Sequence, residues 1–438
     1  MTNQSPLYFR AFLPDRIWDG SSDTSVTGTA ILVEGRQIAG FVRPSDVPSS
    51  YARIALPGCT IIPGLIDSHV HYTAHSGPAF LAAGVTTVRD VGNNLDWILA
   101  QREANASGDS VGPRILCCGF ALDGPRGIWT QVAKRHSDTE GLRASIRENS
   151  DRGVDAIKLY ASITPDLMLA GIQEAKKHGK FVLAHLNETS AEEAAELGLD
   201  EIEHFSRCDV AWRAATEAED DALIDRFLAK RMVMNPTVNV WDRLGRALEL
   251  SFQHDTRRRW VHPDLLSIWD RIPYRTCEPA KRLRFQALMP HLKRFLLRCH
   301  QRGVVLAAGT DTPFINLIPG FGLHDELLQY VDAGLRPVDA LRAATSINAR
   351  VIGLGDRIGR LSTGFDADFV AIVGDPLKRL DDLSNVEMVS CMGTVHDPKA
   401  LLQEAQNGHR LPLDDAMTRD LRAYVSGQMP TYSQRAAE

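Results

Sequence analysis

The chain has 438 residues, of which 44% are hydrophobic and 24% charged, and this is ordinary for a globular protein. Its net charge of −6 at pH 7 gives no electrostatic basis for binding nucleic acid or an anionic membrane. No apolar stretch approaches the roughly 18 residues that span a bilayer, and the odd number of cysteines, seven, argues against a disulfide framework. We therefore expect a cytoplasmic, enzyme-sized protein, and a homo-oligomer is compatible with the sequence.

Strand patterns occur near both ends of the chain. Residues 29–34 and 37–42 are strand-like and are separated by Gly35-Arg36, which predicts a hairpin. Residues 368–373 and 386–392 show a matching pattern. We expect the two ends to form one small β-sandwich, split in the sequence by a central domain.

Between these ends, strand-like and helix-like segments alternate at the rhythm that predicts a parallel sheet. The helices carry start signals, such as Ser190 three residues before Glu193, and stop signals, such as Gly198. The strand-like segments are 61–66, 85–90, 114–119, 156–160, 181–185, 201–204, 232–237 and 304–309. They number eight, as in a (β/α)8 barrel.

The expected fold class is therefore α/β, with a TIM-like (β/α)8 barrel in residues 63–354. The β-sandwich would take its N-terminal part from residues 1–62, and its C-terminal part, with a tail, from residues 355–438.

Residues 238 to about 290 interrupt the alternation of strands and helices. They contain Trp241, Trp260, Trp269 and the run Arg257-Arg258-Arg259. Because the insertion follows the seventh strand, we expect it over the carboxyl ends of the strands, where barrel loops build pockets. Two interpretations stay open, a lid over a substrate or a helical insertion packed against the barrel or a partner subunit.

Side chains that can bind metal recur at one end of these strands. His69 and His71 close the stretch PGLIDSHVH, and on an extended strand their side chains point the same way. Each candidate taken alone could be a buried histidine, a salt-bridged lysine or a helix cap. Their recurrence at the end where barrels of this type have their active sites predicts a metal site. Its candidate ligands are His69, His71, Lys158, His185, His204 and Asp311.

These motifs resemble those of the amidohydrolase superfamily. The resemblance rests on PGLIDSHVH, the strand-4 lysine, the single histidines of strands 5 and 6, and Gly309-Thr310-Asp311, and it extends to ALRAAT at 340–345 and to residues 361–368. Ile202-Glu203-His204 and Gly374-Asp375-Pro376-Leu377 are similar, more narrowly, to the prolidase and imidazolonepropionase-related branch.

The resemblance implies a dinuclear metal centre. His69 and His71 with Asp311 would hold one ion, His185 and His204 the other, and a Lys158 carboxylated by CO2 would bridge the two. Two divalent ions are expected, zinc by default, although such ligands also accept manganese, cobalt or iron.

The implied reaction is hydrolysis of an amide-like C–N bond in an amide, peptide-like or carbamate-like small molecule. A hydroxide bridging the ions would be the nucleophile. Asp311 would be the general base and then the general acid that protonates the leaving amine.

A second interpretation stays open. Glu188 follows His185 with H-x-x-E spacing, which resembles single-metal deaminases and cyclic-amide hydrolases in which a glutamate shuttles protons. Lys158 would then be structural. A third interpretation, a non-catalytic scaffold, is disfavoured because all the candidate ligands are present.

Residues that contact the substrate are less well defined. The loop after strand 3 lacks the Gly-Gly-His of many prolidase-like relatives, so Arg126 or His136 could act there instead. Tyr160 shares the inward face of Lys158, Glu188 is close in sequence to His185, and His324 follows the last strand; all three are further candidates. The aromatic residues of the insertion indicate a bulky or apolar group on the substrate.

Overall fold

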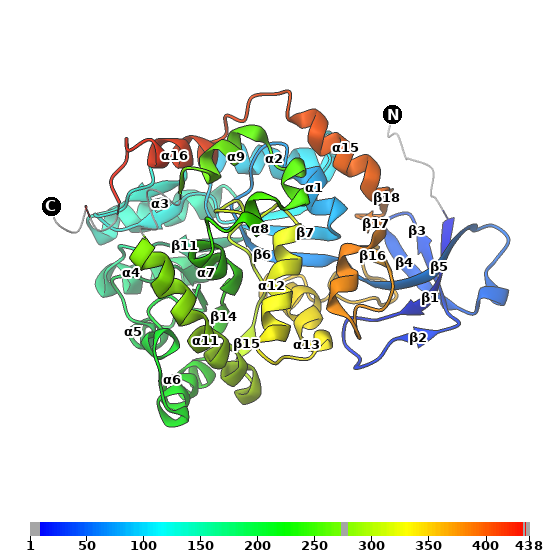
Figure 1. Cartoon of the computed structure of the whole chain (residues 1–438), viewed down its shortest axis with the longest axis horizontal. Helices are drawn as coiled ribbons and strands as arrows, with labels where there is room; N and C mark the ends of the chain where they lie inside the picture. The colour runs from blue at the N-terminus through cyan, green and yellow to red at the C-terminus, as the bar shows by residue number, and fades with distance from the viewer. Residues whose placement is uncertain (1–8, 273–278, 432–433, 435–438) are drawn as a thin grey trace.

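The computed structural model describes residues 9–272, 279–431 and 434. A barrel of parallel strands surrounded by helices lies beside a β-rich unit (Figure 1). Among the described residues, no helix combines the length and the apolar character needed to cross a membrane.

The β-rich unit is one continuous sheet made from both ends of the chain, in the order β18-β17-β16-β5-β1-β3-β4 with β2 paired to β1. Its strands are β1 (Phe9–Ile17), β2 (Val26–Thr27), β3 (Ala30–Glu34), β4 (Gln37–Val42), β5 (Ala52–Pro63), β16 (Phe369–Val373), β17 (Val386–Cys391) and β18 (Thr394–His396). The two ends meet where β16 pairs antiparallel with the last residues of β5. The orange strands therefore lie beside the blue ones in Figure 1. Phe12 and Phe369 pack edge to face in the shared core, with ring centroids 4.9 Å apart.

The barrel strands run parallel and are hydrogen-bonded to their neighbours. They are β6 (Leu65–Val70), β7 (Val85–Asp90), β8 (Arg114–Cys117), β9 (Ala121–Asp123), β11 (Ala156–Leu159), β12 (Phe181–Ala184), β13 (Glu201–Glu203), β14 (Val233–Asn235) and β15 (Val305–Leu306), and β10 (Ala133–Arg135) pairs with β9. Since β8 pairs with β7 and β9 with β11, the two share the place of the third predicted strand. The barrel closes where the Ser68 N–H donates to the Ala308 carbonyl at 3.0 Å.

The prediction of the first barrel strand at residues 61–66 is wrong at its start. Ile61 and Ile62 belong to β5 in the β-rich sheet, and β6 begins only at Leu65. Pro63 has no N–H to continue a ladder. At Gly64 a Cβ would come within 2.1 Å of the Thr86 hydroxyl oxygen, so only glycine fits there. The apolar run therefore passes from one sheet to the next at this point.

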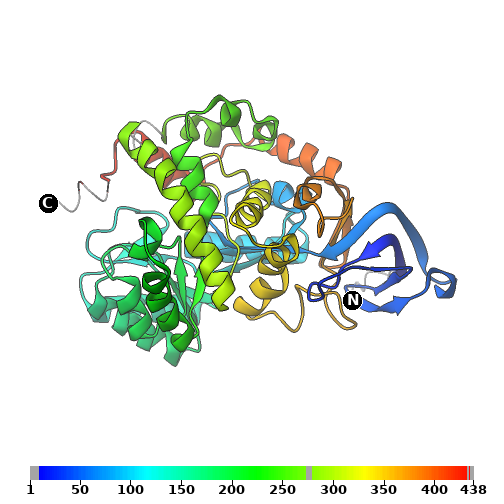
Figure 2. The same cartoon turned by 60° about the horizontal axis from the view of Figure 1, so that its bottom comes forward.

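Helices follow the barrel strands and cover them (Figure 2). They are α1 (Gly77–Ala82), α2 (Leu95–Ser107), α3 (Thr139–Asp151), α4 (Pro165–Lys177), α5 (Ala191–Leu197), α6 (Glu217–Lys230), α12 (Phe321–Asp332), α13 (Pro337–Arg342) and α14 (Asn348–Val351). The predicted capping box is confirmed at α5, where the Ser190 side chain accepts from the Glu193 N–H and the Glu193 side chain accepts in return.

The insertion after β14 is helical in its described part. It consists of α7 (Val238–Gly245), α8 (Leu250–Gln253), the short turn η3 (Thr256–Trp260), α9 (Pro263–Trp269) and the start of α11 (Pro279–Arg302). Its Arg257 pairs with Asp255 and Asp325, and Arg258 pairs with Asp270. These two arginines are therefore neutralised within the fold.

Two further helices follow the β-rich unit, α15 (Pro398–Gly408) and α16 (Ala416–Val425). The first packs against α1. The second, red in Figure 1, lies on the barrel side of the molecule and packs against α9.

Candidate metal centre

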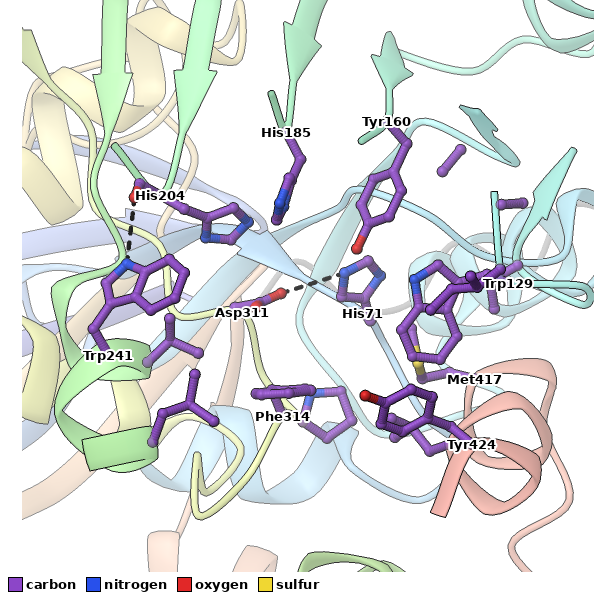
Figure 3. Close-up of a pocket in the computed structure, with 18 residues that line it drawn as sticks. His71, Trp129, Tyr160, His185, His204, Trp241, Asp311, Phe314, Met417 and Tyr424 are labelled. Atoms are coloured by element: carbon purple, nitrogen blue, oxygen red, sulfur yellow. Dashed lines mark hydrogen bonds and ion pairs between the residues drawn. The ribbon is translucent and has the colours of Figure 1, made fainter. Parts of the chain in front are cut away.

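The six predicted ligands lie at or next to the carboxyl ends of barrel strands. His69 is in β6, Lys158 is in β11, and the others follow the strands that position them, His71 after β6, His185 after β12, His204 after β13 and Asp311 after β15. Figure 3 shows His71, His185, His204 and Asp311 around one cavity.

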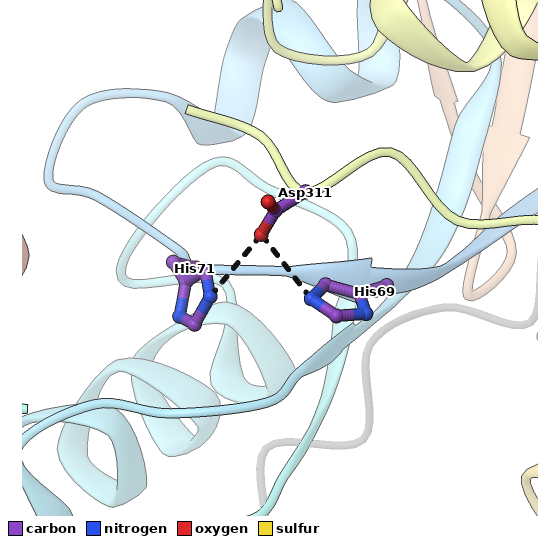
Figure 4. Close-up of side chains that lie close together, drawn as sticks. All are labelled: His69, His71 and Asp311. Carbon is purple, nitrogen blue, oxygen red and sulfur yellow. Dashed lines mark ion pairs between the residues drawn. The ribbon is translucent and has the colours of Figure 1, made fainter. Parts of the chain in front are cut away.

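Three of these residues form a tight group (Figure 4). Asp311 Oδ1 lies 3.2 Å from His69 Nε2 and 3.4 Å from His71 Nε2. One donor atom from each residue fits within 4.8 Å of the others, close enough to share one ion. The main chain fixes this geometry, because the Asp311 N–H donates to the His69 carbonyl at 2.8 Å.

Hydrogen bonds at the back of three histidine rings define which nitrogen faces the cavity. The His71 Nδ1–H donates to the Gly92 carbonyl at 2.9 Å, and the His69 Nδ1–H donates to Glu203 Oε2 at 2.6 Å. His204 Nδ1 lies 2.6 Å from Thr237 Oγ1. Each bond leaves Nε2 available, and such outer partners orient the ligands of metal sites.

The remaining two candidates have unpaired donor atoms. His185 Nδ1 and Lys158 Nζ are buried and, among the described residues, lack a hydrogen-bond partner. Burial, with Lys158 nearby, lowers the pKa of His185 to about 3, so this imidazole is neutral near pH 7. Burial also lowers the pKa of the Lys158 amine. Unpaired buried donors cost free energy, so both atoms fit a site that binds a further group.

Asp311 is a carboxylate in this environment. Burial would raise its pKa, but the electrostatic effect of His204 and the close contacts with His69 and His71 outweigh burial and hold the pKa well below its usual range. The backbone of Asp311 has φ = 65°, the left-handed region that non-glycine residues seldom occupy. Such strain persists only where the surrounding structure imposes it.

Sequence reasoning missed the carboxylates beneath the ligands. Glu203 accepts from His69, and its second oxygen, Oε1, lies 3.7 Å from Lys158 Nζ. Next to it, Glu201 is held by both terminal nitrogens of the buried Arg89, at 3.0 and 2.5 Å. The signal was the spacing, since Glu201 and Glu203 lie two residues apart on one face of β13.

The rest of the cavity is apolar. It has a volume of about 190 Å³. Besides His71, His185, His204 and Asp311, it is lined by Ala121, Ile128, Trp129, Val132, Ala133, Tyr160, Val240, Trp241, Leu244, Pro313, Phe314, Met417, Leu421 and Tyr424. We call the last fourteen the apolar wall.

Part of the apolar wall comes from α16, which sequence reasoning treated as part of a tail. Met417, Leu421 and Tyr424 line the cavity, and Figure 3 shows Met417 and Tyr424 beside it. The Asp420 carboxylate anchors this helix by accepting from the N–H groups of residues 130, 131 and 132 at 3.1, 2.9 and 3.2 Å. The apolar spacing i, i+4, i+7 in residues 417–424 was the available signal for a helix with a buried face.

Of the four predicted substrate contacts, only Tyr160 is found in the lining described above. Contrary to expectation, the other three side chains are held elsewhere. His136 Nε2 lies 2.8 Å from Ser145 Oγ, and the buried His324 Nε2–H donates to the Ala83 carbonyl at 2.8 Å. Glu188 forms an ion pair with Arg126.

Comparison with known proteins identifies a family whose model matches most of the chain. A model described as Amidohydrolase family matches residues 60–396. Among solved structures, the chain is similar to an Xaa-Pro dipeptidase with bound methionine (TM-score 0.70, 20% identity, 89% of this chain and 100% of that one). It is also similar to bottromycin amidohydrolase, with a TM-score of 0.74 and 22% identity over 93% of this chain and 92% of that one. The TM-score with A. niger ochratoxinase is 0.69, with 18% identity over 89% of this chain and 96% of that one. At these identities the likeness shows the fold. No curated protein matches the chain.

Proposed function

Because the chain belongs to the amidohydrolase family and is a hydrolase, we propose that it cleaves an amide-like C–N bond in a small molecule at the cavity described above. The observation that carries the proposal is the convergence of free donor atoms. Three histidines have one ring nitrogen engaged behind the site. The fourth has a nitrogen without a hydrogen-bond partner among the described residues, next to a carboxylate and a lysine whose Nζ likewise lacks a hydrogen bond there.

This donor set fits divalent ions. We assign His69, His71 and Asp311 to one ion, and His185 and His204 to a second. Neutral imidazole and carboxylate ligands suit zinc, and also manganese, cobalt or iron. When bound, the ions would supply polarisation of the scissile carbonyl and a lowered pKa for the attacking water.

Lys158 would complete the site as a carbamate. Its neutral amine adds to CO2, an N–C bond forms and one proton leaves, so a neutral amine becomes an anionic carbamate that could serve as an oxygen ligand. Burial favours this step because it lowers the pKa of the amine. Glu203 Oε1, 3.7 Å from Nζ and without a hydrogen-bond partner among the described residues, is placed to accept the carbamate N–H.

Asp311 would move the proton. As a carboxylate it can accept a proton from the attacking water and then deliver it to the leaving amine. The alternative shuttle, Glu188, gains no support from its position, because its carboxylate is paired with Arg126 outside the cavity lining.

Metal content tests the proposal first. The wild type and Lys158→Ala are purified without chelator and with bicarbonate, and Lys134→Ala is the control because Lys134 pairs with Glu148. We expect about two ions per chain in the wild type and control, and fewer in Lys158→Ala. A carbamate carbon signal from ¹³C-bicarbonate should likewise disappear in Lys158→Ala. One ion in all three proteins would contradict the bridged centre.

Hydrolysis is measured on the same preparations as release of a free amine from uncharged amides. Turnover should depend on added divalent ion and stop with a chelator. Deamination without cleavage of an amide bond would contradict the proposed reaction.

A further inference from the structure

We infer that the substrate is uncharged next to its scissile bond, an apolar amide or carbamate without a free carboxylate or ammonium there. This inference rests on the proposed function and adds the substrate class. Its basis is the chemistry of the apolar wall. Among the described lining residues, the only side chains that carry charge belong to the proposed metal centre.

The polar atoms of the apolar wall are uncharged. Tyr160 and Tyr424 contribute hydroxyl groups, and Figure 3 shows both oxygens directed towards the cavity. Trp129 and Trp241 contribute indole rings, and the Trp241 N–H donates to the His204 carbonyl at 3.3 Å. Hydroxyl and indole groups carry no charge, so they cannot neutralise an ion.

Basic side chains next to the wall in sequence pair elsewhere. Lys134 follows Ala133 of the wall, and its ammonium pairs with Glu148 at 2.6 Å. Arg243 precedes Leu244 and pairs with Asp325 at 2.6 Å. On α16, Arg422 follows Leu421, and its guanidinium lies 3.6 Å from an Asp264 carboxylate oxygen. None of these three cations is among the residues that line the cavity.

A substrate carboxylate beside the scissile bond would therefore lose its hydration without gaining a counter-ion from the wall. Burial of an unpaired charge is far more costly than burial of a hydrogen-bonded neutral amide. The one carboxylate that could face an ammonium, Asp311, already lies against His69 and His71. The charge of the proposed ions is largely offset by Asp311, the Lys158 carbamate and the attacking hydroxide, so the apolar wall sets the selectivity and the site should favour neutral groups over either sign of charge.

Three matched probes test this selectivity by binding: N-phenylacetyl-L-prolinamide, N-phenylacetyl-L-proline, and the aminomethyl analogue with an ammonium at the same position. Quenching of tryptophan fluorescence reports binding to the metal-loaded protein, because Trp129 and Trp241 line the cavity. We expect the neutral amide to bind about 100-fold more tightly than either ion. A charged probe that binds within threefold of the amide, or no binding of the amide, would overturn the inference.

A charge placed in the wall provides the converse test. Met417→Lys puts an ammonium on α16 with little change in side-chain length, and Met417→Leu is the neutral control. The lysine should reduce the preference for the amide over the carboxylate at least tenfold, and leucine should preserve it; equal ratios in both variants would count against the inference. Hydrolysis of the probes is recorded separately. A neutral preference without turnover would refute the proposed reaction alone, whereas turnover with a preference for the carboxylate would refute the inference alone.

Discussion

The two sides of the cavity are built in different ways. On one side, the donor groups come from the ends of parallel strands, and hydrogen bonds behind the rings hold them in place. On the other side, much of the apolar wall comes from the loop around Trp129, from α7 and from α16. The barrel therefore fixes the chemistry, while segments outside it shape what can enter.

The largest effect should come from replacing Asp311, the proposed proton carrier among the strand-end residues. Asp311→Asn keeps the shape of the side chain but removes a base, so we expect kcat for amide hydrolysis to fall about 1,000-fold. The circular dichroism spectrum should stay native, because the main-chain bond from residue 311 to His69 remains. Asp166→Asn, on the exposed first turn of α4, is the matched control. A fall in kcat of less than tenfold would show that Asp311 does not carry the proton in the reaction.

The first side could be predicted from the sequence because its signals are local. The alternation of strands and helices placed His69, Lys158 and Asp311 at one end of a barrel before any contact was known. Residue type could not distinguish a proposed ligand such as His185 from a buried histidine such as His324, since that difference lies in the partner of the ring nitrogen.

The second side could not be predicted in the same way. The contact between α16 and the loop at residues 130–132 joins segments nearly 290 residues apart. The Asp420 carboxylate forms this contact by accepting hydrogen bonds from main-chain N–H groups. Every loop has such groups, so the sequence does not mark the partner segment. The Pro63-Gly64 break between β5 and β6 could not be predicted for a related reason, because β5 ends and β6 begins with isoleucine and leucine residues that form one apolar run in the sequence.

An intermediate effect should come from loosening α16, which forms part of the apolar wall. Asp420→Ala removes the acceptor for three main-chain N–H groups and should loosen α16 from the barrel. We expect KM for a neutral amide to rise about tenfold with kcat changed less than threefold, consistent with the loss of hydrogen bonds to a charged group worth about 2 kcal/mol. Asp414→Ala, exposed just before α16, is the control. A fall in kcat at constant KM would show that α16 affects the chemical step, and that the apolar wall and the strand-end donor groups do not act independently.

The smallest effect on activity should come from His324, which belongs to neither side. Burial lowers its pKa to about 4, whereas an unfolded histidine titrates near 6.5. The unfolded chain therefore takes up the proton first, so stability is full above pH 6.5 and is lost as the pH falls towards 4, by at most about 3 kcal/mol.

His324→Gln should reduce that loss and leave kcat/KM near pH 7 within about twofold, because the ring does not line the cavity. Denaturant unfolding at pH 7 and pH 4.5 measures the difference. A large loss of activity at unchanged stability would indicate that His324 contacts the substrate after all.

The position of α16 has a consequence for how new activities arise in such a chain. The helix lies beyond residue 396, where the match to the family ends, yet it supplies one face of the cavity. Exchange of this segment could redirect the enzyme to another ligand without altering any metal-binding residue. Two chains with the same strand-end residues can therefore diverge in specificity, and grafting of this helix offers a compact route to redesign.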